Sequence, residues 1–212
     1  MEKWRLEKQK MVQRYHEENL TAVKGGTVLV GSSLMEMFPA EEWIREMPEP
    51  RPVVYNRGVG GYTTKDLLPI LSICALELEP KKVFINIGTN DLSDADESVQ
   101  AIMERYDQIL TILEENLPGV KIYLMAYYPV NPDAAVPELK ECLKIRSNEK
   151  IAAANEEVQK LAEKHGQWYI DINDPLKDSQ GRLKAEYTIE GMHINQDGYR
   201  AIFQSLLRYI LD

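Results

Sequence analysis

Four side chains in this sequence could together carry out acyl transfer. Ser33 and Asn90 each follow a short apolar run, and His193 lies near the C-terminus with Glu190 three residues before it. A serine hydroxyl becomes an effective nucleophile only when a neighbouring base takes its proton, and histidine commonly supplies that base. A carboxylate beside the histidine can hold its tautomer and stabilise the imidazolium. These residue types therefore predict a nucleophilic serine activated by a histidine and an acid.

The choice of histidine follows from where each one lies in the chain. His16 is among the charges of an N-terminal helical segment, which favours a solvated side chain. His165 precedes a glycine at the expected end of a helix, where a cation interacts favourably with the helix dipole. His193 occupies an irregular stretch beyond the last expected strand. We therefore expect His193 to be the base.

Two interpretations remain for the acid that would orient His193. Glu190 stands three residues before it, a spacing at which side chains can meet in a turn-like backbone, and Gly191 lets that backbone bend. Alternatively, Glu190 is a solvated surface residue, and Asp171 or Asp174, just past the last expected strand, takes the role. The spacing favours Glu190.

The tetrahedral intermediate of acyl transfer carries an oxyanion, and donors placed in advance around it usually make the largest catalytic contribution. Three donors are candidates here: the backbone N–H groups of Ser33 and Gly61 and the side-chain amide of Asn90. Glycine suits its position because substrate must approach the backbone closely. Simpler interpretations stay open as well, with Gly61 in a tight turn and Asn90 in an Asx turn.

The elements that would position these residues alternate between strands and helices. Such alternation predicts a parallel sheet covered by helices on both faces and joined by right-handed crossovers. We expect a three-layer α/β fold of the flavodoxin-like type with five strands in the order 2-1-3-4-5, whose ligands bind beyond the carboxyl ends of the strands. The expected strands are 27–31, 53–56, 82–87, 120–127 and 168–171, and the expected helices are 3–19, 63–78, 98–116, 142–165 and 196–211.

Prolines mark the segments that we expect to be irregular. Pro69 falls inside 63–78 and predicts a late start or a kink there, because proline cannot donate a helical hydrogen bond. Further prolines predict no regular structure over 39–52 and a loop over 128–139. The loop follows the carboxyl end of a strand, so we expect it to wall the pocket. Residues 34–38 can begin a helix.

Four short blocks carry a family resemblance: Gly31-Ser32-Ser33, Asn56-Arg57-Gly58-Val59-Gly60-Gly61, Gly88-Thr89-Asn90-Asp91 and Glu190-Gly191-Met192-His193. In this order they resemble the SGNH, or GDSL-type, hydrolases, from Thr27 to the C-terminus. The resemblance implies that Ser33 is the nucleophile, because the family nucleophile is the third residue of its first block. It also implies that Gly61, Asn90 and His193 complete the site. Ser32 and Glu190 stand where the family usually has Asp.

Length and charge suggest an ordinary globular protein and argue against several kinds of partner. The 212 residues suit one domain, 1–212, with 1–24 contributing an N-terminal helix that packs on it. A net charge of −9 argues against binding to nucleic acid or to an anionic membrane surface. Apolar runs are too short to span a bilayer, and the charged N-terminus does not resemble a signal peptide. We therefore expect no membrane insertion and a cytoplasmic location.

We expect neither a metal nor another cofactor. The 2 Cys, Cys74 and Cys142, are far apart and show no metal-ligand spacing. A nucleotide- or flavin-binding module on the same architecture is an alternative, and the glycines at 58–61 superficially suggest one. A Gly-x-Gly-x-x-Gly loop would, however, need a third glycine where the chain has Thr63.

The sequence thus predicts a metal-independent serine esterase that hydrolyses small acyl esters. The resemblance implies substrates such as acetylated sugars, short-chain esters or lysophospholipids, and the sequence does not choose among them. An acyltransferase that uses the same acyl-enzyme is an alternative, because an alcohol could replace water in the second step. The expected partner is a small-molecule ester. The sequence leaves open whether the chain forms a homo-oligomer.

Overall fold

The computed structural model describes residues 3–212 and is built on a five-stranded parallel sheet. The strand order is β2-β1-β3-β4-β5, which confirms the predicted topology. Each strand begins or ends within a few residues of its expected limits. The strands are β1 (Thr27–Gly31), β2 (Val54–Asn56), β3 (Lys82–Asn86), β4 (Lys121–Met125) and β5 (Trp168–Ile170).

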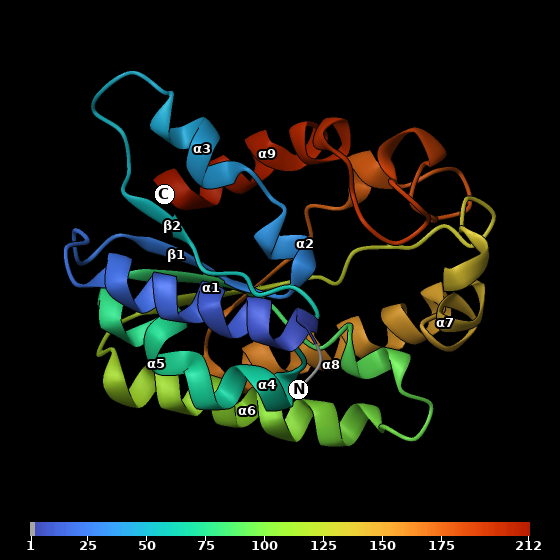
Figure 1. Ribbon diagram of the computed structural model, residues 1–212, viewed down its shortest axis with the longest axis horizontal. Helices are drawn as coiled ribbons and strands as arrows, with labels where there is room; N and C mark the ends of the chain where they lie inside the picture. Colours follow the sequence, from blue (N-terminus) through green and yellow to red (C-terminus); the bar gives the residue numbers. More distant parts are fainter. Residues whose placement is uncertain (1–2) are drawn as a thin grey trace.

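Helices cover both faces of this sheet (Figure 1). In the view of Figure 1, α2, α3 and α9 lie above the sheet, and α4, α5, α6 and α8 lie below it. The helices are α1 (Lys3–Asn19), α2 (Ser33–Glu36), α3 (Ala40–Arg45), α4 (Thr64–Leu67), α5 (Leu71–Cys74), α6 (Val99–Asn116), α7 (Lys140–Ile145), α8 (Asn148–His165) and α9 (Gln196–Leu211), with 3-10 turns at 68–70, 76–78, 91–93, 137–139, 174–176 and 185–187.

The two faces of the sheet bury separate hydrophobic cores. Successive strand residues point to opposite faces, so Val28 and Val30 join the core that includes α6 and α8, whereas Leu29 joins the core under α9. The Phe84 and Tyr123 rings stack on the α9 side with centroids 4.5 Å apart. Burial on both faces explains why the sequences of these strands are continuous apolar runs.

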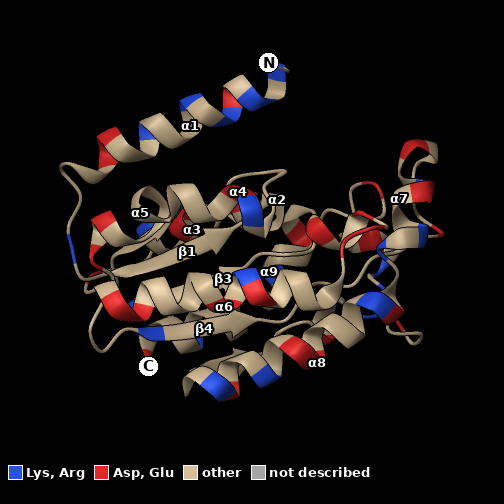
Figure 2. Ribbon diagram, turned by 90° about the horizontal axis from the view of Figure 1, so that it is seen from below, with Lys and Arg blue, Asp and Glu red and all other residues tan. Residues whose placement is uncertain are grey.

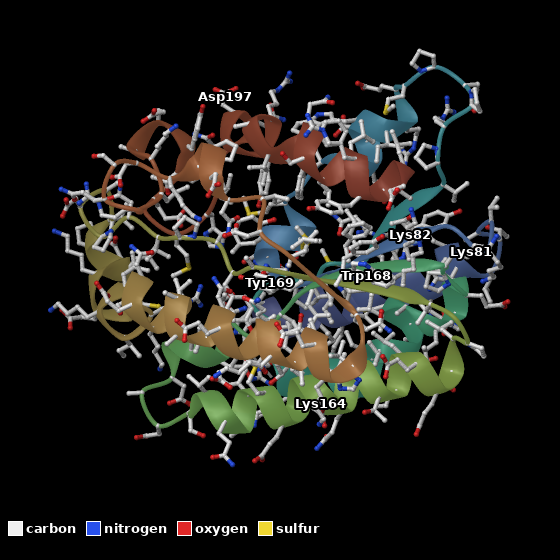
Figure 3. All side chains as sticks on the ribbon, turned by 180° about the vertical axis from the view of Figure 1, so that it is seen from behind. Lys81, Lys82, Lys164, Trp168, Tyr169 and Asp197 are labelled. Atoms are coloured by element: carbon white, nitrogen blue, oxygen red, sulfur yellow. The ribbon has the colours of Figure 1, made fainter. Side chains whose placement is uncertain are left out.

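The parallel register brings the carboxyl ends of the strands to one edge of the sheet. Thr27 pairs with both Val54 and Lys82, and Gly31 pairs with Asn86. The turns after β1, β2 and β3 therefore lie side by side at this edge. Figure 3 labels Lys82 and Trp168, the first residues of β3 and β5, at the opposite edge.

The predicted helix 142–165 is wrong as a single element. α7 ends at Ile145, and Arg146 leaves the helical region with φ −86° and ψ 63°. Ser147 then caps α8, because its hydroxyl accepts a hydrogen bond from the backbone N–H of Lys150 at 3.2 Å. The break places the Arg146 guanidinium beside the turn that follows β3.

Two other segments differ from expectation. The predicted helix 63–78 is divided into α4, α5 and two 3-10 turns, with Pro69 inside the first turn, where a kink was expected. The prediction of no regular structure over 39–52 is wrong, because α3 forms there. Tertiary packing accounts for α3: Ile44 is buried, and the Trp43 ring lies 5.0 Å from that of Phe203 on α9.

The N-terminal helix α1 packs on the core and reaches the turn after β2. Val12 and Tyr15 are buried in the core, and the Tyr15 hydroxyl donates to the Gly58 carbonyl at 2.9 Å. Figure 2 shows basic and acidic residues interspersed along α1 and α8. Within residues 3–212, no helix is long and apolar enough to cross a membrane.

Candidate active site

Ser33 lies where β1 turns into α2. Gly31 ends the strand where the backbone of β3 lies very close to it. A Cβ at this position would come within 2.3 Å of the Asn86 carbonyl oxygen. The Ser32 side chain is buried, and its hydroxyl makes no hydrogen bond to any described residue. The Ser33 hydroxyl instead lies 2.9 Å from Nε2 of His193. The two adjacent serines therefore have different environments, and only the second faces a base.

His193 is held by Glu190 in the geometry that would prepare it to act as a base. Oε1 of Glu190 lies 2.8 Å from Nδ1 of His193 and also accepts the backbone N–H of His193 at 2.8 Å. Because a carboxylate can only accept, Nδ1 carries the proton in the neutral ring, and the lone pair of Nε2 faces Ser33. Both side chains are partly buried, at 28% and 18% exposure.

The two alternative acids face away from this contact. The carboxylates of Asp171 and Asp174 lie 3.3 Å and 3.1 Å from Nζ of Lys177. Asp174 is 94% exposed. In the part of the chain that the structure describes, neither carboxylate hydrogen-bonds to His193. The structure thus brings Glu190, and not these aspartates, to the histidine.

The other two histidines make contacts between helices. Nδ1 of His16 on α1 lies 2.9 Å from Oε1 of Glu77. His165, at the end of α8, lies between two carboxylates of α6, with Nε2 2.8 Å from Asp107 and Nδ1 2.8 Å from Glu114. Neither ring is part of the contact between Ser33 and His193.

The loop 128–139 supports the turn that carries His193. The backbone N–H of Asn131 donates to the Gly191 carbonyl at 2.8 Å. Gly191 has φ +100°, and a Cβ there would come within 2.7 Å of the Cα of Ala135. Only glycine satisfies both conditions without strain. The loop therefore packs directly against the turn that the Glu190–His193 pair requires.

Gly61 lies in the turn after β2, with φ +80° in the left-handed region that favours glycine. This turn is tied to the turn after β1, because the Val59 N–H donates to the Gly31 carbonyl at 2.8 Å. The Gly60 N–H also donates to the carboxylate of Glu36. The Gly61 and Ser33 turns are therefore neighbours.

Two backbone N–H groups at these turns have no hydrogen-bond acceptor within residues 3–212. Neither the Ser33 N–H nor the Gly61 N–H donates to another residue within 3–212. The Trp4 ring, from α1, borders the glycine turn, since a Cβ on Gly61 would lie 3.4 Å from it. An aromatic ring of the N-terminal helix thus lies beside the site.

Asn90 lies in the turn after β3 and links it to the glycine turn. Its Nδ2 donates to the backbone carbonyl of Tyr62, the residue after Gly61, at 2.9 Å. The neighbouring Asp91 is buried and accepts the backbone N–H of Thr64 at 3.0 Å, which anchors the same turn to α4. The structure therefore brings Ser33, Gly61 and Asn90 together at the edge of the sheet.

Arg146 is a residue of this region that the sequence analysis did not single out. Its buried guanidinium donates to Oδ1 of Asn90 at 2.8 Å and to Oγ of Ser93 at 2.7 Å, and it lies 3.3 Å from Sδ of Met192. The sequence contains one indication of the position of Arg146. Serine is favoured at helix N-caps, so Ser147 indicates that a new helix begins just after Arg146.

One cavity of the molecule lies away from this site. A cavity of 720 Å³ lies between α6 and α8, with Met103 and Leu161 in its lining, and it does not include Ser33 or His193. In residues 3–212, no group of three or more His, Cys, Asp and Glu side chains is arranged to hold a metal ion. The contact between Ser33 and His193 is therefore the more informative guide to the chemistry.

The sheet order β2-β1-β3-β4-β5, with helices on both faces, is the fold of a solved GDSL-like lipase from Bacteroides thetaiotaomicron. The chain belongs to the GDSL-like Lipase/Acylhydrolase family, which it matches over residues 20–201. This range runs from the end of α1 into α9 and contains all four blocks noted in the sequence. The description of the family names lipases and acylhydrolases, so residues 20–201 form a domain of that class.

Solved structures share the fold of this chain. A structure from Streptococcus pneumonia, provisionally named a platelet activating factor, is 32% identical, with a TM-score of 0.84 over 98% of this chain and 94% of that chain. Axe2, an acetylxylan esterase from Geobacillus stearothermophilus, has the same fold at 15% identity, with a TM-score of 0.67 over 89% of this chain and 95% of that chain.

A longer relative contains a similar segment. N-acylneuraminate cytidylyltransferase from Escherichia coli is 24% identical over 180 residues. The match covers 82% of this chain but only 38% of the relative, so the chain spans well under half the length of that protein.

Proposed function

We propose that this protein hydrolyses small acyl esters through an acyl-enzyme on Ser33, with His193 as the base and Glu190 as the orienting acid. The observation that carries the proposal is the continuous contact from the Ser33 hydroxyl through the imidazole to the carboxylate, in steps of 2.9 Å and 2.8 Å. Family membership supports ester hydrolysis as the reaction.

The first half-reaction forms the acyl-enzyme. As Oγ of Ser33 attacks the ester carbonyl carbon, Nε2 of His193 takes its proton. Glu190 stabilises the resulting imidazolium, which then gives the proton to the departing alcohol as the tetrahedral intermediate collapses. In the second half-reaction, water attacks the acyl-enzyme and His193 takes a proton from it. The imidazolium then returns that proton to Oγ of Ser33 as the bond to the acyl group breaks and the acid product leaves.

Hydrogen-bond donors around Ser33 would stabilise the two tetrahedral intermediates. Its own backbone N–H, the Gly61 N–H and one N–H of the Asn90 amide are the proposed set. Two of these are uncommitted backbone groups on neighbouring turns, and the third is on an amide that contacts the residue after Gly61. Such fixed donors require no reorganisation when the oxyanion forms.

A fluorophosphonate probe tests the nucleophile directly. We expect covalent labelling of the wild-type protein, loss of labelling in Ser33→Ala and retention in Ser32→Ala, because the Ser32 hydroxyl is buried without a partner in the described chain. The two variants are matched in chemistry and differ by one position. Peptide mapping that locates the adduct outside Ser33 would disprove the assignment.

The choice of substrate is tested with a panel of esters. We propose that short acyl groups are preferred and that no metal is required, so exhaustive chelation leaves the rate unchanged. The panel should include p-nitrophenyl esters of increasing acyl length, a lysophospholipid and acetylated xylan, the last because a structural neighbour is an acetylxylan esterase. A higher kcat/KM for long acyl chains, or activity restored by one metal after chelation, would contradict the proposal.

A further inference from the structure

The value of Asn90 as an oxyanion donor depends on which way its amide faces. Its Oδ1 accepts from Nη2 of Arg146 at 2.8 Å, and its Nδ2 donates to the Tyr62 carbonyl at 2.9 Å. A guanidinium has donors only, and a carbonyl can only accept. A rotated amide would therefore place donor against donor and acceptor against acceptor. These two partners together allow one orientation, which leaves the second N–H of Asn90 available.

The Arg146 guanidinium is itself fixed by contacts to two further segments. Nε donates to Oγ of Ser93 at 2.7 Å, in the 3-10 turn after β3. Nη1 lies 3.3 Å from Sδ of Met192, the residue before His193. Because its donors are distributed over three acceptors, the planar group cannot turn away from Asn90 without losing several contacts. Arg146 thus joins the α7–α8 break, the Asn90 turn and the His193 turn.

The charge of Arg146 is buried without a counter-ion at contact distance. The side chain is 4% exposed, and no carboxylate of the described chain lies within 4.0 Å of it. Arg105, by comparison, lies 3.2 Å from Asp91 and 3.1 Å from Glu97. Burial lowers the pKa of Arg146, but a guanidinium stays protonated at neutral pH. A positive charge facing Oδ1 in a low-dielectric site polarises the Asn90 amide and strengthens its N–H groups as donors.

We propose that Arg146 is a positioning residue of the oxyanion hole, which fixes and polarises the Asn90 amide so that its second N–H donates to the substrate oxyanion. The inference rests on the proposed ester hydrolysis at Ser33. It adds a residue that does not touch the reacting atoms and acts through Asn90.

Steady-state kinetics of two Arg146 variants and one control test this role. In Arg146→Met we expect kcat to fall about 10- to 100-fold, less than for complete loss of an oxyanion donor, with KM changed by less than about threefold. Arg146→Lys should recover part of kcat because it keeps a charge and a donor. The control is Arg105→Met, which removes an arginine that pairs with Asp91, the residue after Asn90, without contacting the Asn90 amide. It reports the effect of disturbing the same turn, and we expect its loss of kcat to be smaller than that of Arg146→Met. Equal losses in Arg105→Met and Arg146→Met would overturn the proposal.

A double variant separates action through Asn90 from an independent effect. If Arg146 works through the amide, Asn90→Ala combined with Arg146→Met should be no more than about twofold slower than Asn90→Ala alone. Losses that multiply would refute the proposal. Should Arg146→Met fail to fold, the same comparison is made with Arg146→Lys.

NMR tests whether Arg146 positions the Asn90 amide and does not depend on catalytic turnover. The side-chain amide resonances of Asn90, assigned by their loss in Asn90→Ala, should shift further in Arg146→Met than in Arg105→Met. Unmoved resonances in Arg146→Met would refute the positioning role, even if the esterase is active. If the wild type neither hydrolyses esters nor labels at Ser33, the proposed function fails, and the amide shifts still report whether Arg146 holds Asn90.

Discussion

Among the proposed oxyanion donors, Asn90 contributes a side chain, whereas Ser33 and Gly61 contribute backbone N–H groups. We expect Asn90→Ala to lower kcat on the order of 10²- to 10³-fold, about 3–4 kcal/mol, as is typical when one such donor is lost. KM should change much less, because the interaction strengthens mainly in the transition state. The matched control is Asn116→Ala, whose exposed amide donates to the Ile112 carbonyl of its own helix. An Asn90→Ala enzyme with normal kcat would remove Asn90 from the site.

Glu190 is tested by replacing its carboxylate with an amide of the same shape. Its Oε1 accepts both the ring N–H and the backbone N–H of His193, and an amide stabilises an imidazolium less well than a carboxylate does. In a serine protease the equivalent change costs roughly 10⁴ in kcat. Because Glu190 is partly exposed, we expect a smaller loss, about 10- to 10³-fold, for Glu190→Gln.

The two aspartates considered in the sequence provide matched controls for Glu190. Asp171→Asn and Asp174→Asn remove the same charge near the end of β5, but their carboxylates face Lys177. We expect both to keep nearly full activity, and Glu190→Asp to recover part of what Glu190→Gln loses. Full activity in Glu190→Gln together with a loss in either aspartate variant would reverse the assignment.

At the scale of the elements, long periodic segments could be predicted and short ones could not. α6 was expected over 98–116 and forms over Val99–Asn116, because its five buried apolar residues recur at helical spacing. The boundary between α7 and α8 depends instead on one capping residue, Ser147, within a continuous helical pattern. α3 depends on packing against α9, which sequence periodicity does not contain.

The contact between α2 and the glycine turn makes a testable link between two elements. The Glu36 carboxylate accepts the Gly60 N–H and pairs with Nζ of Lys8 at 2.7 Å. Glu36→Ala would leave the Gly60 N–H without its charged acceptor, a loss of about 1.5–3 kcal/mol. We expect the melting temperature to fall by about 3–12 °C, since 1 kcal/mol corresponds to roughly 2–4 °C at this chain length.

Lys8→Met is the control for Glu36→Ala. It removes the partly exposed ion pair and keeps the hydrogen bond to Gly60, so we expect a loss of about 0–1 kcal/mol. Calorimetry of both variants separates the two contributions. Equal melting temperatures for the two variants would show that the ion pair, rather than the contact to the glycine turn, holds these elements together.

At the scale of the whole molecule, the chain order of the site residues could be predicted because each follows a strand or precedes the last helix. Ser33, Asn90 and His193 carry chemistry that is recognisable by residue type. Arg146 could not be recognised in the same way, because its neighbours Asn90 and Met192 are 56 and 46 residues away along the chain. Its surroundings exist only after the sheet and the α7–α8 break have formed.

A cluster of charges fastens the far end of α8 to α6 and makes the stability of the molecule depend on pH. Asp107 on α6 lies 2.6 Å from Nζ of Lys164 and 2.8 Å from Nε2 of His165. Figure 3 labels Lys164 near the end of α8, beside α6. The hydrogen bond from Lys164, and then that from His165, hold the pKa of Asp107 below its ordinary value. The folded state therefore favours the ionised carboxylate.

The expected consequence concerns unfolding in urea at different pH values. In the unfolded chain Asp titrates near 3.9, so the contribution of Asp107 is fully present above about that pH and is lost as the pH falls through the lower folded value. Asp107→Asn should therefore be less stable than wild type at pH 7, with a deficit that shrinks below about pH 4. Asp96→Asn, at an exposed aspartate whose side chain has no partner within residues 3–212, should show no deficit at either pH. A deficit for Asp107→Asn that stays constant down to about pH 3 would attribute the effect to packing instead of charge, because packing does not titrate.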